Sequence, residues 1–198
     1  MNKDKYHHGF LEKDMIEKGL QLLNSVGFEA FSLRKVADMC GVSHAAPYRH
    51  FKNKEELINA ITMSVSDEFT SSINNALSKI EGDYRKQIFE VGKLYVKLMT
   101  ENPEHFKFMF MTNHHDPIII KNKDFIQADR WIVSVFKKLF TGLRKNESAG
   151  GHGWSLEALT VWSLIHGFTT MLVNNTISYE GDYLEAVSVM LEKLKLFE

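Results

Sequence analysis

Apolar residues recur along most of the chain at the three- and four-residue spacing of an α-helix. Short stretches with Gly, Pro, Asn or Asp separate these runs, and no stretch shows the alternation of a half-buried strand. The pattern predicts an all-α fold of about nine helices. They are expected over residues 11–26, 33–40, from 44, 54–80, 84–102, 103–111, 124–145, 155–177 and 183–196, with 3–8 frayed, 113–123 a loop or broken helix, and 146–153 a flexible connection.

Two short helices with a tight turn between them are predicted in the first quarter of the chain. Ser32 can cap the first helix, and Gly41 can end it in the left-handed conformation. Ser43 can cap a second helix beginning at His44, although Pro47 predicts an irregular or 3₁₀-like start. This is the pattern of a helix-turn-helix, which places its second helix in the DNA major groove. The apolar face of the first helix consists of Leu33, Val36, Ala37 and Cys40.

The same segment carries a family resemblance. It contains Ala37, Gly41-Val42-Ser43, Tyr48-Arg49-His50-Phe51 and Lys54-Glu55-Glu56-Leu57, and these residues resemble the DNA-binding domain of TetR family transcriptional regulators. The resemblance implies a three-helix helix-turn-helix domain over residues 1–54 and a helical ligand-binding and dimerisation domain over residues 55–198. The helix expected over residues 54–80 joins them without a flexible linker, so the two parts are expected to move together.

Candidate DNA contacts follow from the motif and from the resemblance. The start of the second motif helix is expected to face base edges, with His44, Ala45 and Ser43 as candidates. The resemblance implies that Tyr48 and Lys54 contact phosphates, that Ser32 supports the backbone and that His50 lies near the DNA. The alternative for each is a solvated surface group. Further phosphate candidates are Arg34, Lys35, Arg49 and Lys52.

A symmetric dimer is expected, because one helix-turn-helix makes few contacts and two can read successive half-sites. Trp162, His166 and Gly167 form a W-x₃-H-G sequence, which resembles a signature in the C-terminal domain of one TetR subgroup. Gly167 would let a partner helix approach closely. The mostly apolar helix around it implies burial on more than one side. The predicted dimer contacts are Gly167, Met171, Val187, Leu191 and Leu194.

The middle helices are rich in aromatic residues and methionine, which predicts a pocket for a small apolar or amphipathic effector. The alternative is an ordinary packed core, in which His166 is a hydrogen-bonded core histidine. The candidate pocket residues are Tyr95, Met99, Phe106, Phe110, Trp131, Phe136, Trp162 and His166.

Composition and charge limit the classes of protein to which the chain can belong. The 198 residues carry a formal net charge of −1, which does not by itself indicate nucleic-acid binding. There is no apolar run of about 18 residues and no apolar N-terminal leader, so a cytoplasmic protein without a membrane span is expected. The single cysteine, Cys40, excludes an internal disulfide and is expected in the core, with a redox sensor as the alternative. His105, His114 and His115 lack regular ligand spacing, so neither a metal nor a cofactor is expected.

The sequence therefore predicts a DNA-binding repressor that a small-molecule effector releases from its operator. An activator with the same DNA contacts is an alternative. A helical enzyme is a third reading, but the chain contains no nucleophile elbow, phosphate loop, HExxH motif or paired carboxylates.

Overall fold

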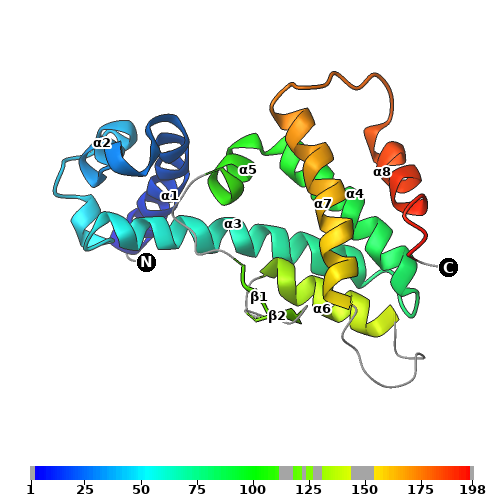
Figure 1. Ribbon diagram of the computed structural model, residues 1–198. Helices are drawn as coiled ribbons and strands as arrows, with labels where there is room; N and C mark the ends of the chain where they lie inside the picture. Colours follow the sequence, from blue (N-terminus) through cyan, green and yellow to red (C-terminus); the bar gives the residue numbers. More distant parts are fainter. Residues whose placement is uncertain (1–2, 112–117, 122–123, 127–130, 144–153, 197–198) are drawn as a thin grey trace. The chain divides into compact units, whose positions relative to one another are not determined.

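The computed structural model describes residues 3–111, 118–121, 124–126, 131–143 and 154–196. These residues form eight α-helices, one 3₁₀ helix and one short β-ladder, so the predicted all-α fold is confirmed (Figure 1). The helices are α1 (Lys3–Ala30), α2 (Leu33–Cys40), η1 (Pro47–Arg49), α3 (Lys54–Leu77), α4 (Tyr84–Glu101), α5 (Pro103–Phe110), α6 (Trp131–Leu143), α7 (Trp154–Val173) and α8 (Tyr183–Glu192), and the strands are β1 (Ile120–Lys121) and β2 (Asp124–Phe125).

Helix α1 starts earlier than the sequence predicts. It begins at Lys3, whereas the sequence predicts a start near residue 11. Gly27 interrupts the helix with φ 73° and ψ 174°, a conformation that a glycine adopts without steric cost. The predicted end at Gly27 is thus a kink, after which helical structure resumes as far as Ala30.

The caps predicted for α2 are present. The Ser32 hydroxyl accepts the backbone N–H of Lys35, and Gly41 adopts the left-handed conformation with φ 66°. The N–H of Val42 then bonds the carbonyl of Ala37 at 3.0 Å, which satisfies one of the last carbonyls of the helix. The apolar face that these caps delimit is buried, with Leu33, Val36 and Ala37 between 0% and 3% exposed.

The second motif helix differs from the prediction. His44 and Ala45 form a turn, and only η1 follows, where the N–H groups of Arg49 and His50 bond carbonyls three residues earlier. Pro47 has no N–H to continue an α-helical ladder, and it occupies the first position of η1. The expected irregular start therefore extends over the whole element.

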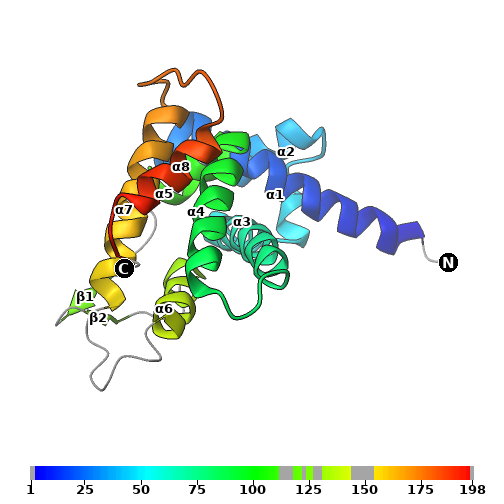
Figure 2. The same cartoon turned by 90° about the vertical axis from the view of Figure 1, so that its right-hand side faces the viewer.

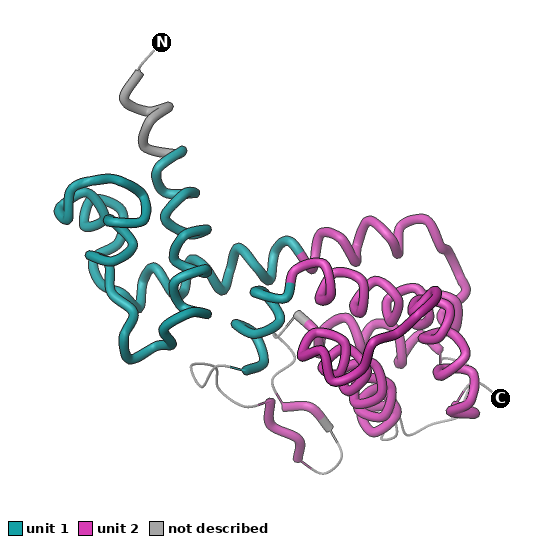
Figure 3. Tube along the Cα trace, turned by 90° about the horizontal axis from the view of Figure 1, so that it is seen from above, with its two compact units in different colours: residues 1–68, 103–115 teal, residues 69–102, 116–198 magenta. Residues whose placement is uncertain are grey.

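Contacts divide the chain into two compact units (Figure 3). The first unit comprises residues 1–68 and 103–115, and the second comprises residues 69–102 and 116–198. Helix α5 groups with the first unit because it packs on α1, where the Asn24 side-chain amide donates to the Glu104 carbonyl at 2.8 Å. This division differs from the boundary predicted after residue 54.

The second unit is a helical bundle in which α4 packs against α6, α7 and α8, and Figure 2 shows α4 running beside α7 and α8. Helix α8 approaches α4 closely at Gly92. A Cβ atom there would lie 3.1 Å from Leu191 Cδ1 and 3.7 Å from Val187 Cγ1. A larger residue at this position would push α8 away from α4.

Two predicted boundaries around residues 113–125 were wrong. Residues 120–121 and 124–125 form an antiparallel ladder that pairs Ile120 with Phe125, where no strand and an early helix start were expected. Phe125 explains the difference, because its ring packs on Trp154 of α7 with centroids 5.6 Å apart. Helix α6 begins only at Trp131.

Candidate nucleic-acid interface and effector-binding region

The exposed side of α2 carries basic side chains. Arg34 and Lys35 are both exposed, and the Lys35 ammonium donates to the carbonyl of Ala30 at 2.8 Å. Within the described part of the chain, Arg34 makes no side-chain hydrogen bond or ion pair. Its guanidinium is therefore available to a phosphate or a base edge.

The turn after α2 places His44 against Asp38. Ser43, His44 and Ala45 are all exposed, as residues that face a groove must be. His44 Nε2 lies 2.7 Å from Asp38 Oδ1, and their side chains are 58% and 65% exposed. The sequence analysis missed Asp38, since nothing in the spacing of a helix and a turn shows which acidic residue the turn will approach.

Tyr48 is an exposed aromatic residue in the same segment. Tyr48 lies on η1 and is 53% exposed, whereas tyrosine side chains are on average more buried. Arg49 and Lys52 beside it are exposed as well. The described structure thus places a phenolic hydroxyl and two cationic groups within five residues of sequence.

Two residues implied as DNA contacts are held by the protein itself. The Lys54 ammonium donates to the Phe28 carbonyl at 3.3 Å and lies 4.2 Å from the centre of the Phe28 ring. The His50 side chain is only 6% exposed, with Nδ1 3.6 Å from Glu12 Oε2. In this conformation the His50 side chain is buried against its own chain, and the sequence carried no signal for Phe28 or Glu12 as partners.

A buried polar cluster connects α4 and α7 in the second unit. Tyr95 is 1% exposed, and its hydroxyl lies 2.8 Å from His166 Nδ1. Trp162 is one turn before His166, with ring centroids 6.0 Å apart, so both residues of the W-x₃-H sequence face the same region. Burial raises the pKa of Tyr95 well above its usual range, and a hydrogen bond from Trp162 acts in the opposite direction. Burial also lowers the pKa of His166.

The other predicted pocket residues do not form one group. Met99 and Phe136 are buried in the second unit, and Phe136 lies 6.2 Å from Trp162 between ring centroids. Phe106 and Phe110 lie on α5 in the first unit, with centroids 5.4 Å apart. The side chain of Trp131 lies outside the described residues.

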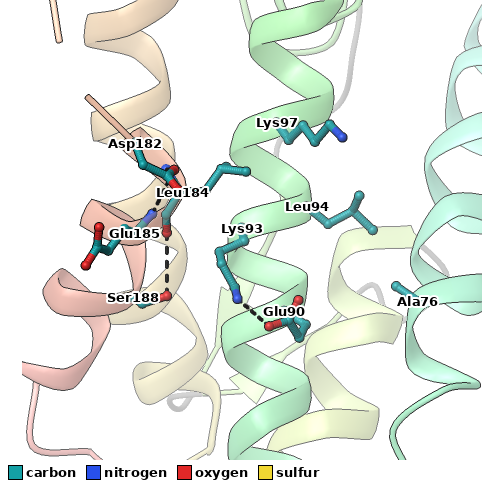
Figure 4. A pocket seen from close by; sticks show the side chains of 9 residues that line it. All are labelled: Ala76, Glu90, Lys93, Leu94, Lys97, Asp182, Leu184, Glu185 and Ser188. Carbon is teal, nitrogen blue, oxygen red and sulfur yellow. Dashed lines mark hydrogen bonds and ion pairs between the residues drawn. The ribbon is translucent and has the colours of Figure 1, made fainter. Parts of the chain in front are cut away.

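A hollow of about 550 Å³ lies between α4 and α8 (Figure 4). Figure 4 shows charged residues from both helices at its edge, and Lys93 is paired with Glu90. None of the predicted pocket residues lines this hollow. A smaller one of about 510 Å³ lies between α8 and the segment around Tyr179, and it too contains none of them.

Helix α7 buries one face and leaves a second, largely uncharged face open. A Cβ atom on Gly167 would meet no atom within 4 Å, and Leu156 and Met171 are 44% and 39% exposed. By length and composition the helix could also cross a membrane, with only 28% of its 18-residue apolar window buried in the structure. Among the described residues, α7 is thus buried on one face, and the expected burial on a second side is not seen.

The predicted dimer contacts on α8 need correction. Val187 and Leu191 are both 0% exposed, because they pack inside their own chain against Gly92 of α4. They are not available to a partner. Leu194 is partly exposed, and Val189 on the outer face of α8 is 44% exposed.

Cys40 is partly exposed rather than fully buried. Burial and the neighbouring Asp14 raise the pKa of its thiol to about 11, which keeps the thiol protonated and unreactive near neutral pH. Among the described residues no group of three metal-ligating side chains occurs. His105 lies 3.9 Å from Glu68, and His114 and His115 are outside the described residues.

These features define the class of protein. A capped helix-turn-helix with exposed tyrosine and basic side chains, followed by a helical unit, is the architecture of a DNA-binding transcriptional regulator. A model of the tetR family of bacterial regulatory proteins matches residues 15–61, and the tetracyclin repressor-like C-terminal domain matches residues 88–194. The chain therefore belongs to the TetR family, whose members bind DNA through the first domain and a ligand through the second.

Individual relatives agree with this assignment. The HTH-type transcriptional regulator YvkB of Bacillus subtilis is 26% identical over 110 residues, covering 56% of this chain and 54% of that protein. The class C tetracycline repressor of Escherichia coli is 45% identical over 47 residues, covering 24% of this chain and 22% of the repressor. The chain thus matches less than two thirds of the length of these curated relatives.

A solved TetR family regulator from Marinobacter aquaeolei has the same fold. It superposes with a TM-score of 0.74 at 18% identity, covering 96% of this chain and 97% of that one. The fold thus extends over nearly the whole of both chains.

Proposed function

We propose that the protein is a cytoplasmic, homodimeric repressor that leaves its operator when a small apolar or amphipathic effector binds. The observation that carries the DNA-binding part is the exposure of Arg34, His44, Tyr48 and Arg49 within one capped helix-turn-helix segment. Repression, rather than activation, is supported by the relative whose name is tetracycline repressor. An activator would use the same contacts, so only the effect on transcription distinguishes the two.

The effector site proposed here is the buried region around Tyr95, Phe136, Trp162 and His166. It combines apolar surface with a few polar atoms, which is the composition of small-molecule sites. These side chains pack on one another in the described conformation. An effector would therefore have to favour a conformation in which they separate, and it would act through its differential affinity for that conformation.

The dimer interface proposed here is the open face of α7, including Gly167 and Met171, together with the exposed side of Leu194. Leu156 and Met171 on this face are 44% and 39% exposed, and exposed apolar patches commonly mark sites of protein association. The W-x₃-H-G sequence fits this arrangement, because His166 points to Tyr95 while Gly167 lies open. Membership of the corresponding TetR subgroup is part of the proposal.

The experiment that tests this function is fluorescence anisotropy with the DNA upstream of the protein's own gene and with scrambled DNA, at two salt concentrations. Selective binding that weakens steeply with salt is expected, because phosphate contacts release counterions. Candidate effectors are then titrated into the complex, and release of the DNA is expected. Equal weak binding to both DNAs, followed by no enrichment from random DNA, would contradict the proposal.

Replacing Tyr48 by alanine is expected to weaken binding about tenfold, because one hydrogen bond to a charged group is lost. The loss should be similar for operator and scrambled DNA, since a phosphate contact carries no sequence information. Anisotropy measures both. Tyr179→Ala is the matched control, as Tyr179 is 45% exposed and lies in the second unit. Equal affinities for Tyr48→Ala and the control would remove Tyr48 from the interface.

A further inference from the structure

One side-chain contact in the first unit joins the last turn of α2 to the turn that follows it. His44 Nε2 lies 2.7 Å from Asp38 Oδ1. Gly41 makes the contact possible, because its left-handed conformation reverses the chain direction between the two residues. Both side chains remain more than half exposed, so the contact does not serve to fill a core.

Asp38 has no other partner among the described residues, and its carboxylate can act only as a hydrogen-bond acceptor. An ionised carboxylate accepts hydrogen bonds and cannot donate them. The imidazole nitrogen that faces Asp38 must therefore carry the proton, so a neutral His44 has N–H at Nε2 and a lone pair at Nδ1. Which nitrogen of a histidine is protonated is commonly set by the hydrogen bond that the other makes.

We propose that Asp38 is a positioning residue for base recognition, which holds His44 with Nδ1 as a hydrogen-bond acceptor toward the major groove. This inference rests on the proposed DNA-binding function. In the major groove the donor groups are the amino groups of adenine N6 and cytosine N4. His44 then selects adenine or cytosine at one position of each half-site and rejects guanine, whose groove edge presents two acceptors.

The neighbouring charges are consistent with this role. Arg34 lies one helical turn before Asp38 on α2, where it could form an i, i+4 ion pair. The described structure instead pairs Asp38 with His44 and leaves the Arg34 guanidinium unpaired. The Asp38 charge is thus engaged beside the groove, where an unpaired carboxylate would repel the DNA backbone.

The first test uses the free protein and needs no DNA. Long-range ¹H–¹⁵N NMR at about pH 8.5, where ordinary imidazole groups are neutral, reports which ring nitrogen carries the proton. His44→Gln identifies the His44 signals among the 9 histidines. The wild type is expected to show Nε2–H, and Asp38→Asn, whose amide can both accept and donate, is expected to show a mixture of the two forms. Protonation at Nδ1 in the wild type would overturn the inference.

The second test selects operators from random DNA with full-length protein. The position read by His44 is the one whose base preference disappears in His44→Ala. At that position the wild type is expected to favour adenine or cytosine over guanine about tenfold. In Asp38→Asn the same preference is expected to fall below about twofold. Asp67→Asn, at an exposed aspartate on α3, is the matched control and should keep the wild-type preference.

The outcomes separate this inference from the proposed function. A wild-type preference that persists in Asp38→Asn, with normal DNA affinity and an unchanged melting temperature, overturns the role of Asp38 and leaves the DNA-binding function intact. If the wild type enriches no sequence at all, the proposed function fails, and the base-reading role fails with it.

Discussion

Replacing Gly167 by leucine is expected to convert a dimer into a monomer without unfolding the chain. A Cβ atom at Gly167 would meet no other atom within 4 Å, so the larger side chain fits the isolated protomer. In the proposed dimer the same side chain would hold the partner helix away from α7. Sedimentation should show the monomer mass, and operator affinity should fall about 100-fold because the two half-sites are no longer bound together.

Two control variants make this result specific. Gly167→Ala adds only a methyl group and should weaken the dimer less than leucine does. Asp67→Leu adds an exposed leucine to α3 in the first unit and should leave the mass unchanged. The far-ultraviolet circular dichroism of all three proteins should match the wild type. A Gly167→Leu protein that keeps the dimer mass would move the interface away from this face of α7.

Replacing Tyr95 by phenylalanine is expected to lower the free energy of unfolding by about 2 kcal/mol, although the change removes a single atom. The hydroxyl contacts His166 Nδ1 at 2.8 Å, and Tyr95 is 1% exposed, so the change removes a hydrogen bond of a buried tyrosine. Chemical denaturation measures the effect. Tyr179→Phe is the matched control, because Tyr179 is 45% exposed. Loss of its hydroxyl should change the free energy of unfolding by less than about 0.5 kcal/mol.

The same cluster predicts a dependence on pH. Burial lowers the pKa of His166 in the folded protein, so the unfolded chain binds a proton more readily. The stability that the neutral ring contributes is fully present above the unfolded pKa of about 6.5 and is lost as the pH falls toward the folded value. The difference in unfolding free energy between wild type and His166→Gln should therefore shrink on acidification. A difference that grows as the pH falls would contradict this account.

The local signals of the sequence determined most of the helix-turn-helix. Ser32, Gly41 and the apolar face of α2 act within one or two turns of helix, so their spacing alone specifies a capped helix and the turn that follows it. Pro47 likewise predicted an irregular element, because the lack of a backbone N–H is a property of proline itself and needs no tertiary contact. The family resemblance covered the same segment and was confirmed over residues 15–61.

Only the tertiary structure decided which partner each of these residues has. The apolar face of α8 has the same sequence pattern whether it packs on its own chain or on a partner chain. Val187 and Leu191 were therefore assigned to the dimer interface, although they are buried within their own chain. Within the chain, a close approach of two helices occurs at Gly92, a position that the sequence pattern did not single out. The pairs His50 with Glu12, Lys54 with Phe28 and Tyr95 with His166 each join residues 26 to 71 positions apart, and no local pattern encodes such distances. The spacing of apolar residues predicts that a side chain is buried. Only the packing of separate helices decides which residues bury it.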